Sequence, residues 1–427
     1  MARRRIKRQI KIIILLVVVI GAIIFAVSFR AGLGNEITYG IDSRTACRTY
    51  GSGFIQYTRD GVAYYNSSGE RVWNDTYTMT TPIAVERDDF TAIFETGGRS
   101  VRVYNKDGAI YNVQTSDMIQ SVSLTENGYI GVISNGDTTT VSVYSLTGSL
   151  IFQRVEADDG VYPLCCDISP DGKIIAIGYI DTTGTKIKSK IGMFYIAANT
   201  ETDNRDSMFT ANEKDNEIIF KIYFVSKSRI IAVGDRHVYA ISTTGMEEAS
   251  AEVTNEIVGA GLCGNKIALI YGEELSDKDG EAPGTVVFVS SGGRLSTGAS
   301  IGTVPDYFQC SSGGIVLGTG TAFYGISAGG SLAWTLNVMG NVTGIYPTSN
   351  INKCVYSTRT WSVIEDMRYF DASKYEPRTI PVTNTDNEES QDNDSTENGE
   401  NTNDTEPAES EAGGEKPDEN NENNENN

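Results

Sequence analysis

The chain has 427 residues, 39% of them hydrophobic, and a formal net charge of −21. This composition suits a soluble β-rich body better than a membrane protein with many spans. Because non-specific binding to nucleic acid requires clustered Lys and Arg, the acidic balance argues against nucleic acid as a partner.

The N-terminal segment has the features of a membrane anchor. Residues 1–11 carry six Lys or Arg, and residues 12–29 contain no charged side chain. As a helix, this second stretch would extend roughly 27 Å, close to the thickness of a bilayer core. The positive-inside rule then predicts a cytoplasmic stub at 1–11, a transmembrane helix at 12–29 and an extracellular remainder. A cleaved signal peptide is the alternative, although its apolar region is usually shorter.

A short unit of strands and glycine turns recurs after a linker at residues 30–44. Residues 127–154 show it clearly, with strands expected at 129–134, 140–145 and 149–153. Alternating apolar residues with Gly-containing turns are typical of half-buried strands in hairpins. The recurring turns contain Gly69, Gly108, Gly148, Gly245, Gly292 and Gly330, and Asn199 takes this place in the fourth unit.

Three or four strands about every 40 residues is the spacing of a β-propeller blade. One blade cannot bury both of its faces, so blades must stack around an axis. We therefore predict an all-β fold, a β-propeller over residues 45–372, with eight blades favoured and seven as the alternative. The units begin near Gly53, Asp89, Gly128, Gly172, Ser228, Asn265, Gly313 and Lys353. The last unit lacks an outer strand, and we expect a segment at about residues 36–41 to supply it and close the ring.

Short motifs carry a resemblance to known propellers. Residues 69–73 (GERVW) and 330–334 (GSLAW) resemble the Gly-x-x-x-Trp end of quinoprotein-type, PQQ-like repeats. In those repeats the Trp packs between neighbouring blades. Residues 169–173 (SPDGK) look like the turn between the first two strands in many bacterial, WD40-like propellers. Other units have residues such as Tyr111 or Phe152 in place of the Trp.

The whole layout is similar to an uncharacterised family of membrane-anchored propellers from Gram-positive bacteria. It consists of a basic stub, one span, a degenerate propeller and an acidic tail. The resemblance implies the fold, and it lends no catalytic residue because the family's function is unknown.

Three lysines form a candidate binding patch in an insertion of the fourth unit. Lys186, Lys188 and Lys190 alternate, so on a strand they would share one face. Such a face could hold an anionic ligand or polymer. The alternative interpretation is a strand edge on which lysines prevent pairing with another chain.

Six cysteines are present, and outside the membrane they could pair. Cys263 and Cys310 occupy comparable places before successive units, which predicts neighbouring inner strands. They form a candidate disulfide if their Cα atoms lie within about 7 Å. The alternative is that the cysteines are small buried hydrophobes.

Catalytic groups are scarce in the sequence. The one histidine, His237, opens an expected strand, and we expect it to pack within a blade rather than form a Ser-His-Asp site. There is no Cys-x-x-Cys motif for zinc and no Gly-rich phosphate loop. We therefore predict no catalytic residue, no metal site and no cofactor.

The C-terminal residues 373–427 are expected to be a disordered acidic tail. Residues 384–427 carry 16 Asp or Glu and almost nothing apolar, so they cannot offset the entropy of ordering.

These observations favour a non-enzymatic binding or scaffolding module, tethered to the membrane in the cell envelope. Its partner would be a protein or a cell-wall component. One alternative is a quinoprotein-like oxidoreductase, which would need a cofactor seat. The other is a sensor that signals through a membrane partner, because a stub of 11 residues is too short to hold an output domain.

Overall fold

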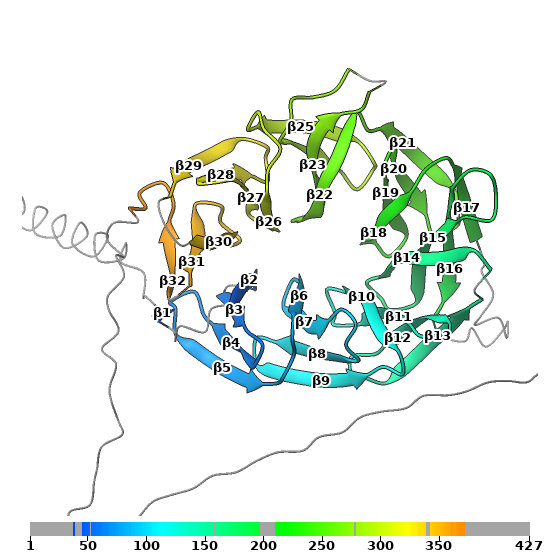
Figure 1. Cartoon of the computed structure of the whole chain (residues 1–427), viewed down its shortest axis with the longest axis horizontal. Helices are drawn as coiled ribbons and strands as arrows, with labels where there is room; N and C mark the ends of the chain where they lie inside the picture. Colours follow the sequence, from blue (N-terminus) through cyan, green and yellow to red (C-terminus); the bar gives the residue numbers. More distant parts are fainter. Residues whose placement is uncertain are drawn as a thin grey trace, which may run out of the picture. The chain divides into compact units, whose positions relative to one another are not determined.

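The computed structural model describes residues 37–38, 45–51, 53–157, 159–196, 210–276, 279–338, 342–359 and 361–371. In these ranges the chain forms 32 strands in eight four-stranded antiparallel sheets. The sheets stand around a central axis as the blades of a propeller (Figure 1). The favoured count of eight blades is thereby confirmed.

Each blade contributes one strand to each of four positions, counted outward from the axis. The innermost strands are β2 (Ala46–Tyr50), β6 (Pro82–Arg87), β10 (Met118–Leu124), β14 (Val161–Ile168), β18 (Ile219–Ser226), β22 (Asn255–Cys263), β26 (Tyr307–Ser311) and β30 (Val342–Pro347). The second strands are β3 (Gly53–Tyr57), β7 (Phe90–Glu95), β11 (Ile130–Asn135), β15 (Ile174–Asp181), β19 (Arg229–Gly234), β23 (Lys266–Glu274), β27 (Gly314–Thr319) and β31 (Lys353–Thr358).

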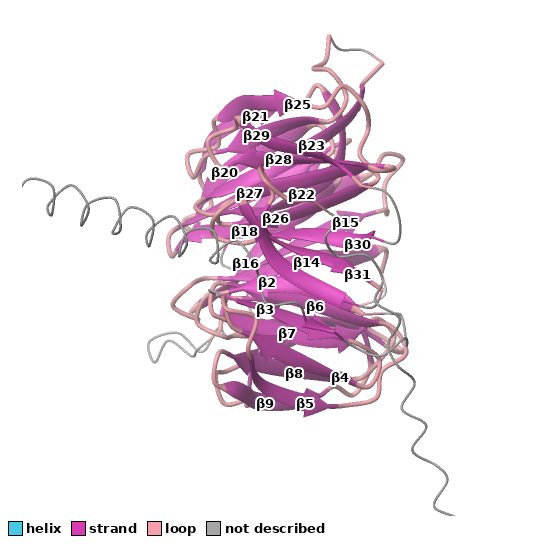
Figure 2. Ribbon diagram, turned by 90° about the vertical axis from the view of Figure 1, so that its left-hand side faces the viewer, coloured by secondary structure: helices cyan, strands magenta, loops and turns pink. Residues whose placement is uncertain are grey.

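The third strands are β4 (Gly61–Tyr65), β8 (Ser100–Asn105), β12 (Thr139–Tyr144), β16 (Lys188–Tyr195), β20 (His237–Ser242), β24 (Thr285–Val289), β28 (Ala322–Ser327) and β32 (Trp361–Asp366). The outer strands are β5 (Arg71–Thr76), β9 (Gly108–Gln114), β13 (Leu150–Glu156), β17 (Thr210–Asp215), β21 (Glu247–Glu252), β25 (Leu295–Ser300), β29 (Leu332–Asn337) and β1 (Ile37–Thr38). We number the blades one to eight in the order of their innermost strands. Figure 2 shows the same strands from the side.

The last blade closes the ring with a strand from the other end of the propeller sequence. Its order is β1-β32-β31-β30, and Ile37 and Thr38 pair antiparallel with Ser362 and Trp361. This is the closure that the sequence predicts. Because β1 precedes blade one and completes blade eight, it joins the two ends of the propeller sequence within one sheet.

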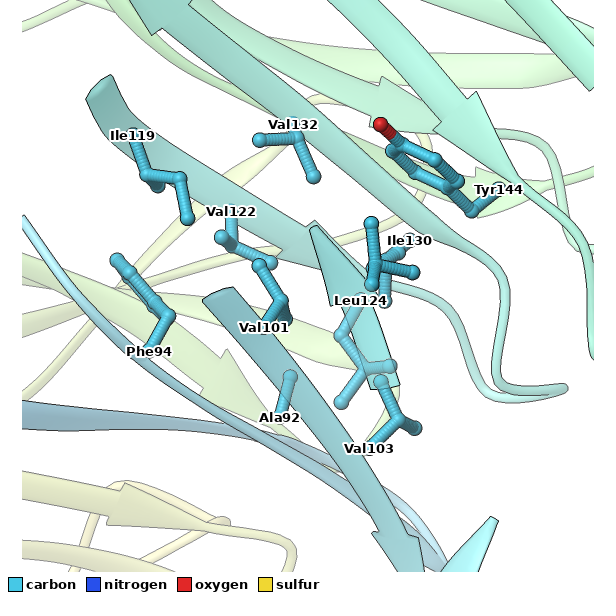
Figure 3. Packing of buried hydrophobic residues seen from close by; sticks show 11 residues of the cluster. Ala92, Phe94, Val101, Val103, Ile119, Val122, Leu124, Ile130, Val132 and Tyr144 are labelled. Carbon is cyan, nitrogen blue, oxygen red and sulfur yellow. The ribbon is translucent and has the colours of Figure 1, made fainter. Parts of the chain in front are cut away.

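Apolar side chains on facing blades form the core, and the contact between blades two and three is typical. Val101 and Val103 of β8 pack against Ile130 and Val132 of β11 in one buried cluster (Figure 3). Burying each such side chain stabilises the fold by roughly 1.5–3 kcal/mol. The core of the ring is therefore a series of such interfaces, one for each pair of neighbouring blades.

Indole rings join neighbouring blades, as the resemblance to quinoprotein-type repeats implies. Trp73 stacks on Tyr104 of the next blade, with ring centroids 5.3 Å apart. It also donates a hydrogen bond of 3.0 Å to the carbonyl of Lys106. Trp334 donates one of 2.7 Å to the carbonyl of Ile351 in blade eight. The indoles therefore fix the angle between blades as well as burying apolar area.

Several predicted segments lie outside the described residues. They are the stub at 1–11, the span at 12–29 and the tail at 373–427. In the part of the chain that the structure describes, no helix has the length and hydropathy needed to cross a membrane.

Candidate functional site

A cavity of about 1190 Å³ lies at the centre of the ring. Innermost strands provide most of its wall. The rest of the wall comes from the hairpins that connect the first and second strands in all eight blades. We call the end of the ring where these hairpins lie the hairpin face. The lining residues from these hairpins include Gly51, Asp88, Asn127, Asp171, Lys227, Asn265, Ser312 and Ser349. Loops from every blade thus converge on one opening, the usual arrangement of a binding site on a rigid scaffold.

One arginine spans the cavity. Arg87, at the end of β6, lies 3.6 Å from a carboxylate oxygen of Asp167 on β14 and donates a hydrogen bond of 3.0 Å to the carbonyl of Phe224 on β18. The amide of Phe224 donates a bond of 2.7 Å to the same carboxylate. Burial raises the pKa of Asp167, and Arg87 acts in the opposite direction. Arg87 therefore joins blades two, four and five across the axis.

A second ion pair lies beside the first. Arg48 of β2 is 3.7 Å from Glu86 of β6, and its guanidinium lies 6.0 Å from the ring centroid of Tyr346 in blade eight. Burial raises the pKa of Glu86, with Arg48 acting against it. Both arginines of the cavity wall are thus balanced by a carboxylate.

Lys221, on the innermost strand β18, is a cation of the cavity wall that has no such partner. Its side chain is exposed within the lining, and no described residue forms an ion pair or hydrogen bond with it. Tyr223 and Gln309 line the same cavity, and their side chains also have no hydrogen-bond partner among the described residues. The site therefore offers an ammonium, a phenol and an amide to an incoming polar group.

The buried thiols beside Lys221 are chemically quiet. Burial raises the pKa of Cys165 and of Cys166 to about 12, and Lys221 lowers it by less than burial raises it. Since the thiolate is the nucleophile, both groups are almost entirely protonated at neutral pH. The cavity can bind, but these cysteines are not poised to attack a substrate.

The structure places the candidate lysine patch in blade four, away from the cavity. Lys188 and Lys190 lie on β16 and pair with Asp215 and Glu213 on β17, and Lys188 forms a 3.1 Å ion pair with Asp215. Lys186 is exposed just before the strand. The alternative of a strand edge is wrong, because β16 lies between β15 and β17.

The candidate disulfide is absent from the structure. Cys263 and Cys310 are on neighbouring innermost strands, as predicted, but both are free thiols. The sulfur of Cys310 lies against Gly261, two residues before Cys263 on β22. Two strand residues correspond to roughly 7 Å, so the offset along the strand separates the two thiols.

His237 packs at the boundary of blades four and five. Its backbone amide donates a 2.7 Å bond to Glu217, and its Nδ1 lies 3.3 Å from the other oxygen of that carboxylate. Glu217 also accepts a bond from Tyr239. This is the packing role that the sequence predicts. Within the described ranges, no three His, Cys, Asp or Glu are grouped to hold a metal ion.

The cavity residues were not singled out by the sequence motifs. Arg87 and Asp167 resemble ordinary charges near strand ends, since nothing local indicates that they meet across the cavity with one blade between them along the ring. A usable signal did exist. Asp167 stands between Cys166 and Ile168 in an apolar run, and a charge inside a buried strand requires a partner.

The fold and cavity define an eight-bladed β-propeller with a lined central site. The chain belongs to the family of unknown function DUF5711, whose model matches residues 34–364. No curated protein matches the sequence.

Solved propeller structures share the fold at low sequence identity. The C-terminal WD40 domain of Sif2 has a TM-score of 0.53 and 12% identity over 78% of this chain and 99% of that one. BamB from Moraxella catarrhalis has a TM-score of 0.45 and 12% identity over the same shares. At 12% identity, the likeness to the Sif2 domain shows the fold alone.

Proposed function

We propose that this protein is a non-enzymatic binding module of the cell envelope, tethered by residues 12–29, and that a partner protein docks on its hairpin face. The observation that carries this proposal is the unpaired ammonium of Lys221 on the wall of a cavity whose two arginines are each paired with a carboxylate. An unpaired charge in a concave site is a recognition group that awaits a partner. An acidic or carbonyl-rich loop of the partner would satisfy it.

The sequence outside the described residues supports the tether. Six basic residues precede the uncharged stretch, which favours a cytoplasmic N-terminus and a propeller outside the cell. The single histidine is held by Glu217, and the thiols beside the cavity are protonated at neutral pH. Both observations favour binding over catalysis.

Site-specific crosslinking in intact cells tests the proposal. A photoreactive phenylalanine analogue at Lys227, on the cavity rim, should yield a crosslinked protein partner. The same analogue at Val72, exposed on the outer strand β5, is the matched control and should not. Adding Lys221→Glu to the rim variant should lower the crosslinked yield several-fold, because it reverses the charge in the cavity. A crosslink to wall polymer instead, equal yields from both positions, or no adduct would overturn docking of a protein at this face.

A further inference from the structure

A second hollow lies between the outer parts of blades two and three. Its volume is about 290 Å³, just below the roughly 300–1,000 Å³ typical of ligand pockets. We call it the interblade groove. Strand β9 forms one wall, β12 and β13 form the other, and the end of β11 contributes to the base. It is separate from the central cavity, with which it shares no lining residue.

The groove is bounded at both ends by close contacts at glycines. A Cβ on Gly148 would meet the ring of Tyr111, and a Cβ on Gly136 would meet the carboxylate of Asp117. Tyr111 is further fixed by a hydrogen bond to the carbonyl of Gly128. Strand β9 and the connection that follows it therefore contact blade three at both ends of the groove and leave the hollow between these contacts.

Buried hydroxyl groups form the base of the groove. Ser134, Thr140 and Ser142 lie on the face of blade three that looks toward blade two, continuing the row of Ile130 and Val132 outward. These three residues are 4%, 6% and 3% exposed, respectively. Ser134 and Thr140, which pair across β11 and β12, have no hydrogen-bond partner for their hydroxyls among the described residues.

In the two neighbouring interfaces between blades, a carboxylate of one blade accepts hydrogen bonds from side chains of the next. Between blades one and two, Asp75 binds Arg102 and Tyr104, each at 2.9 Å. Between blades three and four, Glu156 accepts a bond of 2.6 Å from Tyr179. Among the described residues of the interface between blades two and three, no carboxylate accepts a hydrogen bond from Ser134 or Thr140, so these hydroxyls stay open to the groove.

The lining selects the chemistry of an occupant. An apolar molecule would leave the hydroxyls of Ser134 and Thr140 without partners and would also displace the water that could satisfy them, which is unfavourable. Asp117 is the one acidic or basic side chain in the lining, so an anionic molecule would find no cation to pair with. A neutral molecule rich in hydroxyls satisfies both conditions. Gln153 adds an amide at the rim, and the exposed side chain of Leu150 offers an apolar contact for the C–H face of a ring.

We infer that the interblade groove binds a neutral sugar unit, with the hydroxyls of Ser134 and Thr140 as its deepest contacts. This site is independent of partner docking on the hairpin face. Thr140→Val provides a sharp test because valine has the shape of threonine without the hydroxyl. Since that hydroxyl has no protein partner, the free energy of unfolding should stay equal or rise, whereas sugar binding should weaken.

The experiment is saturation-transfer NMR on the full-length protein with glucose, galactose, N-acetylglucosamine and cellobiose as probes. At least one probe should give a signal that weakens tenfold or more in Thr140→Val, and also in Gln153→Ala at the exposed rim. Thr91→Val is the matched control, because its hydroxyl donates to Val85 far from the groove. That variant should lose stability and keep sugar binding. The inference would be overturned if no probe gave a signal, which is the result expected for a groove filled only by water. It would also be overturned if Thr140→Val gave the same signal as the parent protein.

Discussion

At the scale of single residues, the ring relies on carboxylates placed between blades. Asp75, Glu156 and Glu217 each follow or end the outer part of one blade and accept a hydrogen bond from a tyrosine of the next. Hydrogen bonds to charged groups are roughly twice as strong as neutral ones. Across the central cavity, another carboxylate, Asp167, pairs with Arg87 and so connects two blades that are not neighbours.

Removing Arg87 should reveal the charge that it balances. Arg87→Met leaves Asp167 buried without its cation, and we expect a loss of about 3 kcal/mol in the free energy of unfolding near neutral pH. The folded-state pKa of Asp167 is already raised by burial, and the loss of Arg87 raises it further. A raised folded-state pKa means that the folded form binds a proton more readily, so stability falls as pH rises from about 3.9 through that pKa.

The loss caused by Arg87→Met should therefore be greater at pH 8 than at pH 5. Urea unfolding of residues 31–383, which include all 32 strands, measures it at both values. Arg368→Met is the control, because the ion pair of Arg368 with Asp366 is at the surface and should contribute little at either pH. A loss that is the same at pH 5 and pH 8 would contradict a charged Asp167 as its cause.

At the scale of elements, the shortest strand, β1, joins the two ends of the propeller sequence. β1 has two residues, yet it joins the start of the propeller sequence to β32 near its end. In a closed ring each blade has a neighbour on both sides, and β1 covers the start of the edge at which β32 could pair with another molecule.

Blocking this strand should open one blade before the others. The double variant Ile37→Pro, Thr38→Pro lacks the backbone N–H groups of both residues. Adjacent residues of a strand direct their N–H groups to opposite sides, so one of the two lost groups is the one that faces β32. Hydrogen exchange measured by mass spectrometry should accelerate in β31 and β32 and leave blades three to five unchanged. Ile37→Val with Thr38→Val keeps the N–H groups and should exchange like the parent. Uniform acceleration around the ring would contradict a local closing role.

At the scale of the whole molecule, periodicity predicted the architecture and could not predict the site. Spaced glycine turns such as Gly69 and Gly148 require positive φ, observed as 77° and 75°, and mark the repeat directly. The closing strand followed from counting strands in the last unit. The central cavity depends on which strand ends meet across the axis, and the groove depends on which side chains of blades two and three face each other. Neither property is local in the sequence.

The reactivity of the six cysteines measures the unfolding of the ring, because they lie in five of its eight blades. Five are buried and Cys310 is half-buried, and they are distributed over blades one, four, six, seven and eight. Burial raises the pKa of Cys47 and of Cys263 to about 11, so little reactive thiolate forms at pH 8. We expect the native protein to react very slowly with a thiol reagent such as Ellman's reagent.

In urea, all six thiols should become reactive in one transition that coincides with the change in tryptophan fluorescence, because a closed ring unfolds as a unit. Labelling counted by mass spectrometry across the transition measures this directly, and the same titration after reduction is the control. Only four thiols labelled in the unreduced, unfolded protein would show a disulfide, contradicting the free Cys263 and Cys310 of the structure. Labelling in separate steps would show that blades unfold independently and that closure contributes little to cooperativity.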